Sequence, residues 1–448
     1  MKMVLGKMTH GKMWWRLLCT IERKDKRMKL YKIILSTFLV LTLMSGCSQR
    51  SSEVMLIENE PLAEQEHIFL SVYGYKADAH NLTAIESILN RYMEQNPEVI
   101  VTYEGVKGID YWNAFERRVQ ANGLDDVFMV DHDREIELAA QGKLADLSGL
   151  PTIEKYQDII KEQFIREDGS VYFLPTCISA YGLYINYDLL EEHGQKVPEK
   201  WSEFMEVCQY FAGKGITPIV ANNYASLRNL IVGKSLYSVY QKDSAAAIEA
   251  FNHAPEELVN TLRPGIEMVE EMIDRKWIDC EEVSVTNQTS DDLRLFAGGD
   301  RPFMITGNWA TSRVADMEPG FSCGVHPFPI LDDGSVLVIE ANTCISVNAG
   351  SEHIEEVMEL VECITQPDSI WEYCDSQNSY TPLKDDRVPT DQTILPASEY
   401  LESGRIVIGS DYRLSLSLDN SLSEITKQML DGISSDEAVA LLNQLLAQ

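Results

Sequence analysis

The chain has 448 residues, of which 45% are hydrophobic and 24% charged, so it has the composition of a globular protein and the length for two or three domains. Its net charge of −32 is unevenly distributed. Residues 1–46 hold ten Lys and Arg against two Asp and Glu, and the remainder holds 28 against 68. So acidic a body repels nucleic acid and anionic lipid surfaces, and we expect no nucleic-acid partner.

The N-terminal region has the pattern of a secretory signal. Met28 to Lys32 is basic, Ile33 to Met44 is an apolar run of twelve residues, and small residues follow at Ser45-Gly46. The apolar run is shorter than the roughly 20 residues that span a bilayer. We therefore expect a cleaved signal peptide that begins at Met28.

The end of this signal contains a cysteine. Leu43 to Cys47 resembles a bacterial lipobox, from which the bulky Met44 departs. The resemblance makes Cys47 the expected lipid attachment site, and an ordinary signal that ends near a cysteine is the alternative. We expect residues 1–46 to be an N-terminal extension and lipoprotein signal peptide, and the polar residues 47–66 to be a tether.

Strand and helix patterns alternate in the first part of the body. The capping-box pattern Thr83 to Glu86 predicts the start of one of the helices. Alternation at this spacing predicts an α/β sheet with parallel crossovers. The expected strands are 68–73, 99–103 and 127–130, and the expected helices begin at Thr83, cover 112–121 and end near Gly142.

A second alternating region follows Pro175. The helix that begins at Trp201 should end at Gly213 and Gly215. A second capping box, Ser434 to Glu437, predicts the start of the last helix, with Leu441, Leu442 and Leu445 buried. The remaining expected elements are strands 181–187 and 216–220 and helices around 256–274 and 352–366.

Sequence motifs for catalysis and metal binding are missing. The chain contains no G-x-S-x-G, H-E-x-x-H, Walker A, G-x-G-x-x-G or C-x-x-C motif, and its eight histidines are scattered. Carboxylate pairs are no evidence of a glycosidase among 70 acidic residues, because catalysis needs two of them about 5–10 Å apart around one sugar. We expect no catalytic residue, no metal and no cofactor, and hence a protein that is not an enzyme.

Four stretches in the same order resemble the extracellular solute-binding proteins of family 1, the group that includes maltose-binding protein. The resemblance runs from about Ile68 to the end, and Asp125 departs from it by replacing a usual proline. The four stretches are 126–128 with 142–147, 169–175 with 181–190, 198–204 with 215–219, and 296–300 with 303–309.

This resemblance implies an α/β, two-lobed periplasmic-binding-protein-like fold of type II, with a ligand cleft between lobes joined by hinge crossovers. Closure of the hinge would bury the ligand. The implied lobes are 67–176 plus 341–374 and 178–338 plus 380–448, with crossings near 175–181, Glu340 and 376–380.

A sugar is recognised by carboxylates and amides around its hydroxyls and by aromatic rings against its C–H faces. Ligand sites in α/β sheets gather at the carboxyl ends of strands. Trp309 is expected to bind ligand because the resembled family has a stacking Trp at the matching position. Loop packing, helix capping and core packing are the alternatives. The expected ligand-binding residues are Tyr73, Tyr75, Asp131, Asp133, Tyr181, Asn222, Trp309, Glu340, Asn342 and Tyr380.

The resemblance also implies partners and a location. We expect a monomer, lipid-anchored at the extracellular face of the bacterial cytoplasmic membrane, that delivers a small carbohydrate to the permease subunits of an ABC importer. Where the family often has Trp or Gly, Glu340 introduces a carboxylate, which would suit an amine-bearing ligand. The alternatives are a peptide, polyamine or metal-complex carrier, a sensor subunit for a membrane kinase, and a secreted glycosidase.

Overall fold

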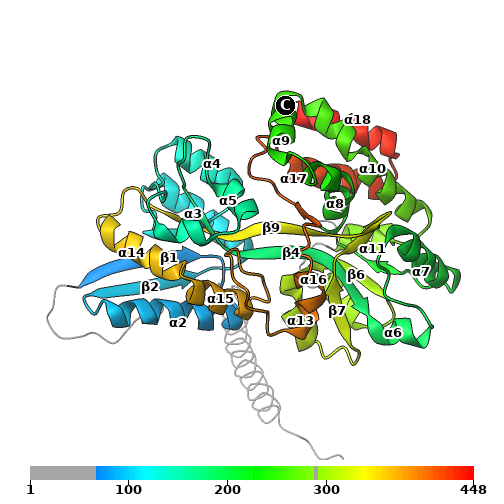
Figure 1. The fold of residues 1–448 in the computed structure, drawn as a ribbon, viewed down its shortest axis with the longest axis horizontal. Coiled ribbons are helices and arrows are strands. Elements are labelled where there is room, and N and C mark those ends of the chain that lie inside the picture. The colour runs from blue at the N-terminus through cyan, green and yellow to red at the C-terminus, as the bar shows by residue number, and fades with distance from the viewer. Residues whose placement is uncertain (1–66, 223–224, 287–290, 448) are drawn as a thin grey trace, which may run out of the picture. The chain divides into compact units, whose positions relative to one another are not determined.

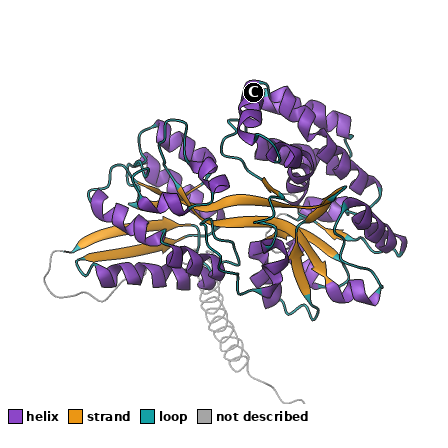
Figure 2. Cartoon of the chain, in the orientation of Figure 1, coloured by secondary structure: helices purple, strands orange, loops and turns teal. Residues whose placement is uncertain are grey.

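The computed structural model describes residues 67–222, 225–286 and 291–447, which belong to one compact unit, Met55–Gln448 (Figures 1 and 2). The expected signal peptide, the tether and the lipid attachment site Cys47 lie outside the described residues. In the described part of the chain, no helix is both long and apolar enough to cross a membrane.

One ten-stranded sheet organises the described residues in the order β2-β1-β3-β9-β4-β6-β5, with β10 and β8 beside β9 and β7 beside β4. β1 is parallel to β2 and β3, as predicted, whereas β9 is antiparallel to both β3 and β4. The strands are β1 (Ile68–Gly74), β2 (Val99–Gly105), β3 (Val127–Val130), β4 (Leu174–Asn186), β5 (Ile219–Val220), β6 (Phe303–Gly307), β7 (Cys323–His326), β8 (Phe328–Leu331), β9 (Gly334–Val347) and β10 (Ile406–Ile408).

Two long strands, β4 and β9, run side by side through the middle of the sheet (Figure 1). All 13 residues of β4 are buried. The prediction of a strand at 181–187 was therefore too short, because Thr176 and Ser179 break the apolar pattern of the first half of β4. Both side chains are buried, and Thr176 Oγ1 donates to the carbonyl of Thr343 in β9. β4 and β9 connect the two groups of helices.

The first group of helices lies around β1, β2 and β3. The predicted capping box at Thr83 is wrong, because α2 begins four residues earlier and the Thr83 hydroxyl donates to the carbonyl of Ala79 inside the helix. Leu82 is buried against the core, which favours the longer helix. The helices are α2 (Ala79–Gln95), α3 (Gly108–Gln120), α4 (His132–Ala140), η1 (Pro151–Lys155), α5 (Asp158–Phe164), α14 (Ile354–Ile364) and α15 (Pro367–Ser376).

The second group surrounds the β6 end of the sheet. The capping box at Ser434 and Glu437 is confirmed, and it starts the last helix, in which Leu442 is buried but Leu441 and Leu445 are half-buried. The helices are α6 (Tyr187–Glu192), α7 (Trp201–Gly213), α8 (Ser226–Tyr240), α9 (Ser244–His253), α10 (Pro255–Asp274), α11 (Cys280–Val285), α12 (Asp291–Ala297), η2 (Asn308–Ala310), α13 (Thr311–Asp316), η3 (Gln392–Ile394), α16 (Leu395–Ser398), α17 (Leu418–Leu430) and α18 (Ser435–Leu446).

Gly182 gives a test of the packing of β4. A Cβ atom at Gly182 would lie 2.6 Å from the backbone oxygen of His326 in β7, whereas a Cβ at Gly213, at the end of α7, would meet nothing within 4 Å. We expect Gly182→Ala to lower the free energy of unfolding by about 1–3 kcal/mol, because strands must separate to make room. Gly213→Ala is the control and should cost nothing. Equal urea midpoints for the two variants would contradict this packing.

Candidate functional site

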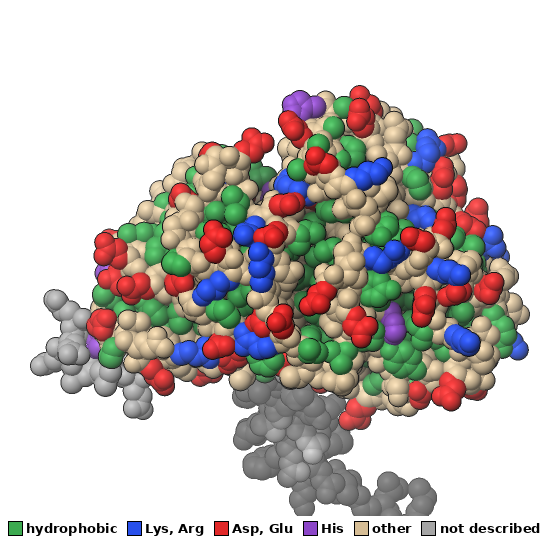
Figure 3. All heavy atoms as spheres, in the orientation of Figure 1, with side chains coloured by type: hydrophobic (Ala, Val, Ile, Leu, Met, Phe, Trp, Pro, Cys, Tyr) green, Lys and Arg blue, Asp and Glu red, His purple; other side chains and the backbone are tan. Residues whose placement is uncertain are grey.

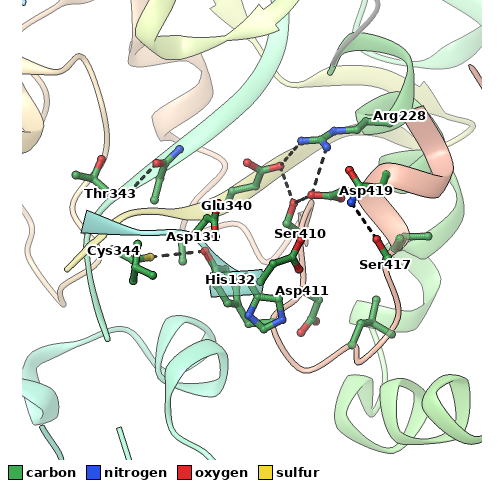
Figure 4. Close-up of a pocket in the computed structure, with 18 of the residues that line it drawn as sticks. Asp131, His132, Arg228, Glu340, Thr343, Cys344, Ser410, Asp411, Ser417 and Asp419 are labelled. Atoms are coloured by element: carbon green, nitrogen blue, oxygen red, sulfur yellow. Dashed lines mark hydrogen bonds and ion pairs between the residues drawn. The ribbon is translucent and has the colours of Figure 1, made fainter. Parts of the chain in front are cut away.

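A cavity of about 510 Å³ lies between the two groups of helices, above β9. Its walls come from the N-termini of α3 and α4, from residues 340–344 of β9, from Arg228 of α8 and from residues 410–420. Figure 3 shows the surface hollowed between these two sides, with acidic and basic side chains interspersed around it. In Figure 4, Asp131 and His132 face Arg228 and Asp419 across Glu340.

Half of the residues predicted to bind ligand are brought together here. They come from segments that directly follow β1 and β3 and from the middle of β9, although long stretches of chain separate them. The five are Tyr75, Asp131, Asp133, Glu340 and Asn342.

Asp131 shows how one wall is built. Its Oδ1 accepts a hydrogen bond of 3.0 Å from the backbone N–H of Arg134, which caps α4, and its Oδ2 pairs with the Arg134 guanidinium. That guanidinium lies 4.1 Å from the ring centroid of Trp112 and also pairs with Glu116. Arg134 therefore fixes both a carboxylate and an indole at the cavity wall. Asp131 therefore lines the cavity and also caps α4, which was the alternative role expected for it.

His132 has buried nitrogens at the same wall. Neither ring nitrogen has a hydrogen-bond partner among the described residues, and the ring packs edge-on against Tyr412 with centroids 4.3 Å apart. Burial lowers the pKa of His132, against the opposing effect of Asp133. At neutral pH the ring is uncharged and can donate one hydrogen bond and accept another.

A charged cluster forms the opposite wall. Arg228 pairs with Glu340 at 3.6 Å and with Asp419 at 3.3 Å. The Ser410 hydroxyl lies 3.2 Å from Glu340 Oε1 and also contacts Asp419 Oδ2. The Ser410 hydroxyl has one hydrogen, so it can donate to only one of the two carboxylates at a time.

Glycines bring the parts of this cluster close together. A Cβ on Gly233 of α8 would lie 2.9 Å from Val338, which shares a face of β9 with Glu340. Arg228 lies five residues before Gly233, about 7.5 Å along the helix, and Glu340 lies two residues after Val338, about 6.6 Å along the strand. The long Arg228 side chain reaches Glu340, with 3.6 Å between its guanidinium and the carboxylate. Gly409, where a Cβ would lie 3.0 Å from Glu340, lets residues 409–410 approach.

Burial dominates the electrostatics of the cluster. It raises the pKa of Glu340 from 4.5 to about 7, even though Arg228 lowers it. Burial also lowers the pKa of Arg228, but Asp419 and Glu340 outweigh this and raise it above its ordinary value. Arg228 thus stays charged, while Glu340 titrates near neutrality. Within the described residues, no group of three His, Cys, Asp or Glu side chains is placed to hold a metal ion.

The backbone of β9 is distorted at the cavity. Thr343 has φ of +49°, a conformation that β-branched residues rarely adopt. Its N–H donates to Asn342 Oδ1, and Asn342 Nδ2 donates to Ser179 Oγ at 3.0 Å. Strained residues of this kind cluster at binding sites. The amide of Asn342 is therefore held in place by both long strands.

Two predicted residues are buried away from the cavity. Tyr73 is fully buried and stacks on Tyr111 with ring centroids 4.6 Å apart, because it faces α3 from within β1 whereas Tyr75 lies beyond the strand end. Asn222 is also fully buried, and its Oδ1 accepts from the backbone N–H groups of Ala225 and Ser226 at the start of α8. Packing and helix capping account for these two side chains.

Three more predicted residues lie elsewhere. Tyr181 lies behind the charged cluster, next to Arg228 and Glu340, and burial raises its pKa. The half-buried Trp309 packs edge-on against Tyr181, at 5.1 Å between centroids, and does not line the cavity. Tyr380 lines a second cavity of about 660 Å³ beside Trp371, and its hydroxyl donates to the carbonyl of Ile394.

Sequence reasoning missed several residues that line the cavity. Trp112, Arg228 and the segment 410–420 were not among the predicted site residues. His132 lies between Asp131 and Asp133, so its position in the sequence already indicated that it would line the same site. The signal for Arg228 was weaker, because it consisted only of a charged residue near the start of a mostly apolar helix, α8. Residues 410–420 gave none, because their approach to β9 is a tertiary event.

The comparisons with known proteins identify the family of the chain. The model of the family described as bacterial extracellular solute-binding protein matches residues 87–394, well over half of the chain. The chain belongs to this family. This confirms the family resemblance predicted from the sequence. The family consists of binding proteins, and membership in it places this solute-binding protein in the extracellular or periplasmic space.

Two curated relatives are similar over most of their lengths. The multiple sugar-binding protein of Streptococcus mutans is 21% identical over 347 residues, which cover 75% of this chain and 80% of that protein. The melibiose/raffinose/stachyose-binding protein MelE of Bacillus subtilis is 21% identical over 313 residues, 68% of this chain and 69% of that protein.

Solved structures confirm the predicted two-lobed α/β fold. Apo RafE from Streptococcus pneumoniae has a TM-score of 0.67 at 19% identity and covers 87% of this chain and 98% of its own. A family 1 extracellular solute-binding protein from Bifidobacterium longum subsp. infantis has a TM-score of 0.68 at 17% identity and covers 86% of this chain and 100% of its own.

The raised pKa of Glu340 predicts a pH dependence of stability. The native state binds this proton more tightly than the unfolded chain, so the charge on Glu340 lowers the free energy of unfolding as pH rises from about 4.5 to about 7. Glu340→Gln removes this loss, which is at most about 1.4 kcal/mol per pH unit. Urea unfolding of both proteins across this range measures the difference. The exposed Glu206→Gln is the control, and parallel pH profiles for wild type and Glu340→Gln would contradict the prediction.

Proposed function

We propose that this solute-binding protein captures a carbohydrate in the cavity above β9 and delivers it to the permease of an ABC importer. The observation that carries the proposal is the joint presence of aromatic rings and fixed hydrogen-bonding groups around about 510 Å³ of space. Cavities of this size hold small-molecule ligands. We propose no enzymatic activity for the cavity.

The lining matches the two chemical features of a sugar. Trp112, Tyr75 and Tyr412 offer apolar ring faces for C–H groups, and the carboxylates and Asn342 accept hydrogen bonds from hydroxyls. Neither ring nitrogen of His132 has a hydrogen-bond partner among the described residues, and two different sugar hydroxyls can satisfy them, one accepting from the N–H and one donating to the other nitrogen. The multiple sugar-binding protein, MelE and the complex of RafE with raffinose support the same ligand class.

Capture in this proposal uses the two lobes predicted from the sequence. The proposed lobe boundaries fall within β4 and β9 and in the segment that follows α15. A small bend in strands shared by both lobes would open the cavity without breaking either core. The proposed lobes are 67–176 plus 341–374 and 178–338 plus 380–448.

A ligand screen tests the function. Ligand that binds the native state alone raises the melting temperature, so a micromolar binder at millimolar concentration should give a clear thermal shift. We expect a shift with one class of mono- or oligosaccharide. No shift with any sugar in a broad panel, together with a shift for a peptide, polyamine or metal complex, would contradict the carbohydrate proposal.

Trp112 distinguishes between the two cavities. Trp112→Ala should weaken binding of the sugar found in the screen by at least about 1 kcal/mol, roughly fivefold in Kd, because it removes an aromatic contact. Trp371→Ala is the matched control, since Trp371 lines the second cavity. Calorimetric titration of both variants measures the effect. Loss of binding in Trp371→Ala alone would move the site to the second cavity.

We propose that a lipid on Cys47 anchors the protein at the membrane, close to the permease that it supplies. Cys47→Ala should shift the protein from the membrane fraction to the medium or periplasm, because one signal for anchoring is lost. Cell fractionation measures this, with Cys280→Ala in the half-buried Cys280 as the control. Continued membrane retention of Cys47→Ala would defeat the anchor proposal.

A further inference from the structure

The charges around the cavity are strongly unequal. Arg228 is the one Lys or Arg side chain among the described residues that line it. Burial and the pKa shift leave His132 uncharged, so it adds no positive charge near neutral pH. The carboxylates that line the cavity are Asp131, Asp133, Glu340, Asp411 and Asp419.

Arg228 has little attraction left for an anion. Its guanidinium lies between the carboxylates of Glu340 and Asp419, at 3.6 and 3.3 Å, and its side chain is 17% exposed. A ligand carboxylate would have to compete with both of these partners. Because two negative charges already face one positive charge, a third would add net repulsion at short range.

Two arginines behind the cavity wall, Arg134 and Arg413, are engaged in the same way. Arg134 pairs with Asp131 and also with Glu116. Arg413 pairs with the buried Asp411 and, at 2.6 Å, with Glu162 of α5. Each arginine is therefore held by two carboxylates, so neither leaves a positive charge for the cavity.

The N-terminus of α4, another place where an anion would be favoured, is also occupied. Asp131 Oδ1 already accepts from the backbone N–H of Arg134 there, and Asp133 adds negative charge in the first turn. An incoming carboxylate would displace a side chain of equal charge. The N-terminus of α4 therefore offers an anion no free site, and Asp110 and Asp419 add negative charge to the first turns of α3 and α17, which also line the cavity.

We propose that the carboxylates held by Arg228, Arg134 and Arg413 make the cavity select sugars by charge, admitting uncharged and amine-bearing sugars and rejecting those with a carboxylate, sulfate or phosphate group. The selection rests on the proposed carbohydrate function and assigns a ligand class to it. Glu340 is the residue that determines this specificity. Two carboxylates, Glu340 and Asp419, share Arg228, and Glu340 is the more buried of the two.

Calorimetric titration of the purified protein with matched sugars tests the selection. The probes are glucose, glucuronate and glucosamine, galactose, galacturonate and galactosamine, and the oligosaccharides of each charge class built from them, all at low salt. Uncharged and acidic sugars are compared at about pH 8.5, where Glu340 carries its charge, and the amines at about pH 7, where they are protonated. In every set where the uncharged sugar binds, the acidic one should bind at least about tenfold more weakly, and the amine at least as tightly.

The outcomes separate the two proposals. If no sugar binds, either in this panel or in the broad thermal-shift screen, both the carbohydrate function and the selection fail. If an uncharged sugar binds and its acidic counterpart binds as tightly or more tightly, the function stands and the charge selection is overturned. An amine that binds tenfold more weakly than the uncharged sugar would overturn it as well.

Substitution tests the role of Glu340. Glu340→Gln should narrow the ratio between uncharged and acidic sugars by at least about threefold, because one repelling charge is removed and the side chain keeps its size. Glu206→Gln, on the exposed face of α7, should leave the ratio unchanged. If Glu340→Gln melts far below the wild type, Asp419→Asn replaces it, since that carboxylate is 37% exposed. An unchanged ratio in a folded variant overturns the assignment.

Discussion

The antiparallel pairing of β4 with β9 is the constraint on which the rest of the structure depends. Both strands belong to the one sheet that joins the two groups of helices, and β4 is buried along its whole length. Their register sets Glu340 opposite Ser179 and Asn342 opposite Cys177. A slip of one residue would turn Glu340 to the other face of the sheet, away from Arg228. Pairing therefore determines both the continuity of the fold and the position of the charge in the cavity.

A buried carboxylate in a central strand is costly, and the surrounding structure is arranged to offset that cost. Glu340 is 8% exposed, and the residues on either side of it in the strand, Ile339 and Ala341, are apolar and buried. Close packing of α8 at Gly233 brings Arg228 to it, and Gly409 lets Ser410 approach. Such pairs rarely add net stability over an apolar core, so recognition explains the carboxylate of Glu340 better than folding stability does. The strained Thr343 nearby indicates the same.

Local patterns predicted much of the fold and part of the site. The strand at 127–130 and the cap of the last helix were correct because each is specified within a few residues. Asp131, Asp133 and Tyr75 line the cavity for a similar reason, since each lies within three residues of a strand end. The ligand contacts themselves stay predictions.

The sequence failed where side-chain direction depends on distant segments. Tyr73 and Tyr75 are two residues apart, yet the first is covered by α3 and the second reaches the cavity. Asn222 follows a strand, as a ligand contact would, but its Oδ1 accepts hydrogen bonds from the backbone at the start of α8. Arg228 and Asp419 lie nearly 200 residues apart and meet because α8 and α17 pack together. Such a meeting has no local signal.

The most direct measurement is a crystal structure of the protein with the tightest-binding sugar from the screen. The account predicts a sugar in the cavity above β9, with a ring face against Trp112 and hydroxyls hydrogen-bonded to Asp131 or Asp133 on one wall and to Glu340 on the other. A sugar bound instead beside Trp371 in the second cavity, or one that contacts none of these residues, would contradict it.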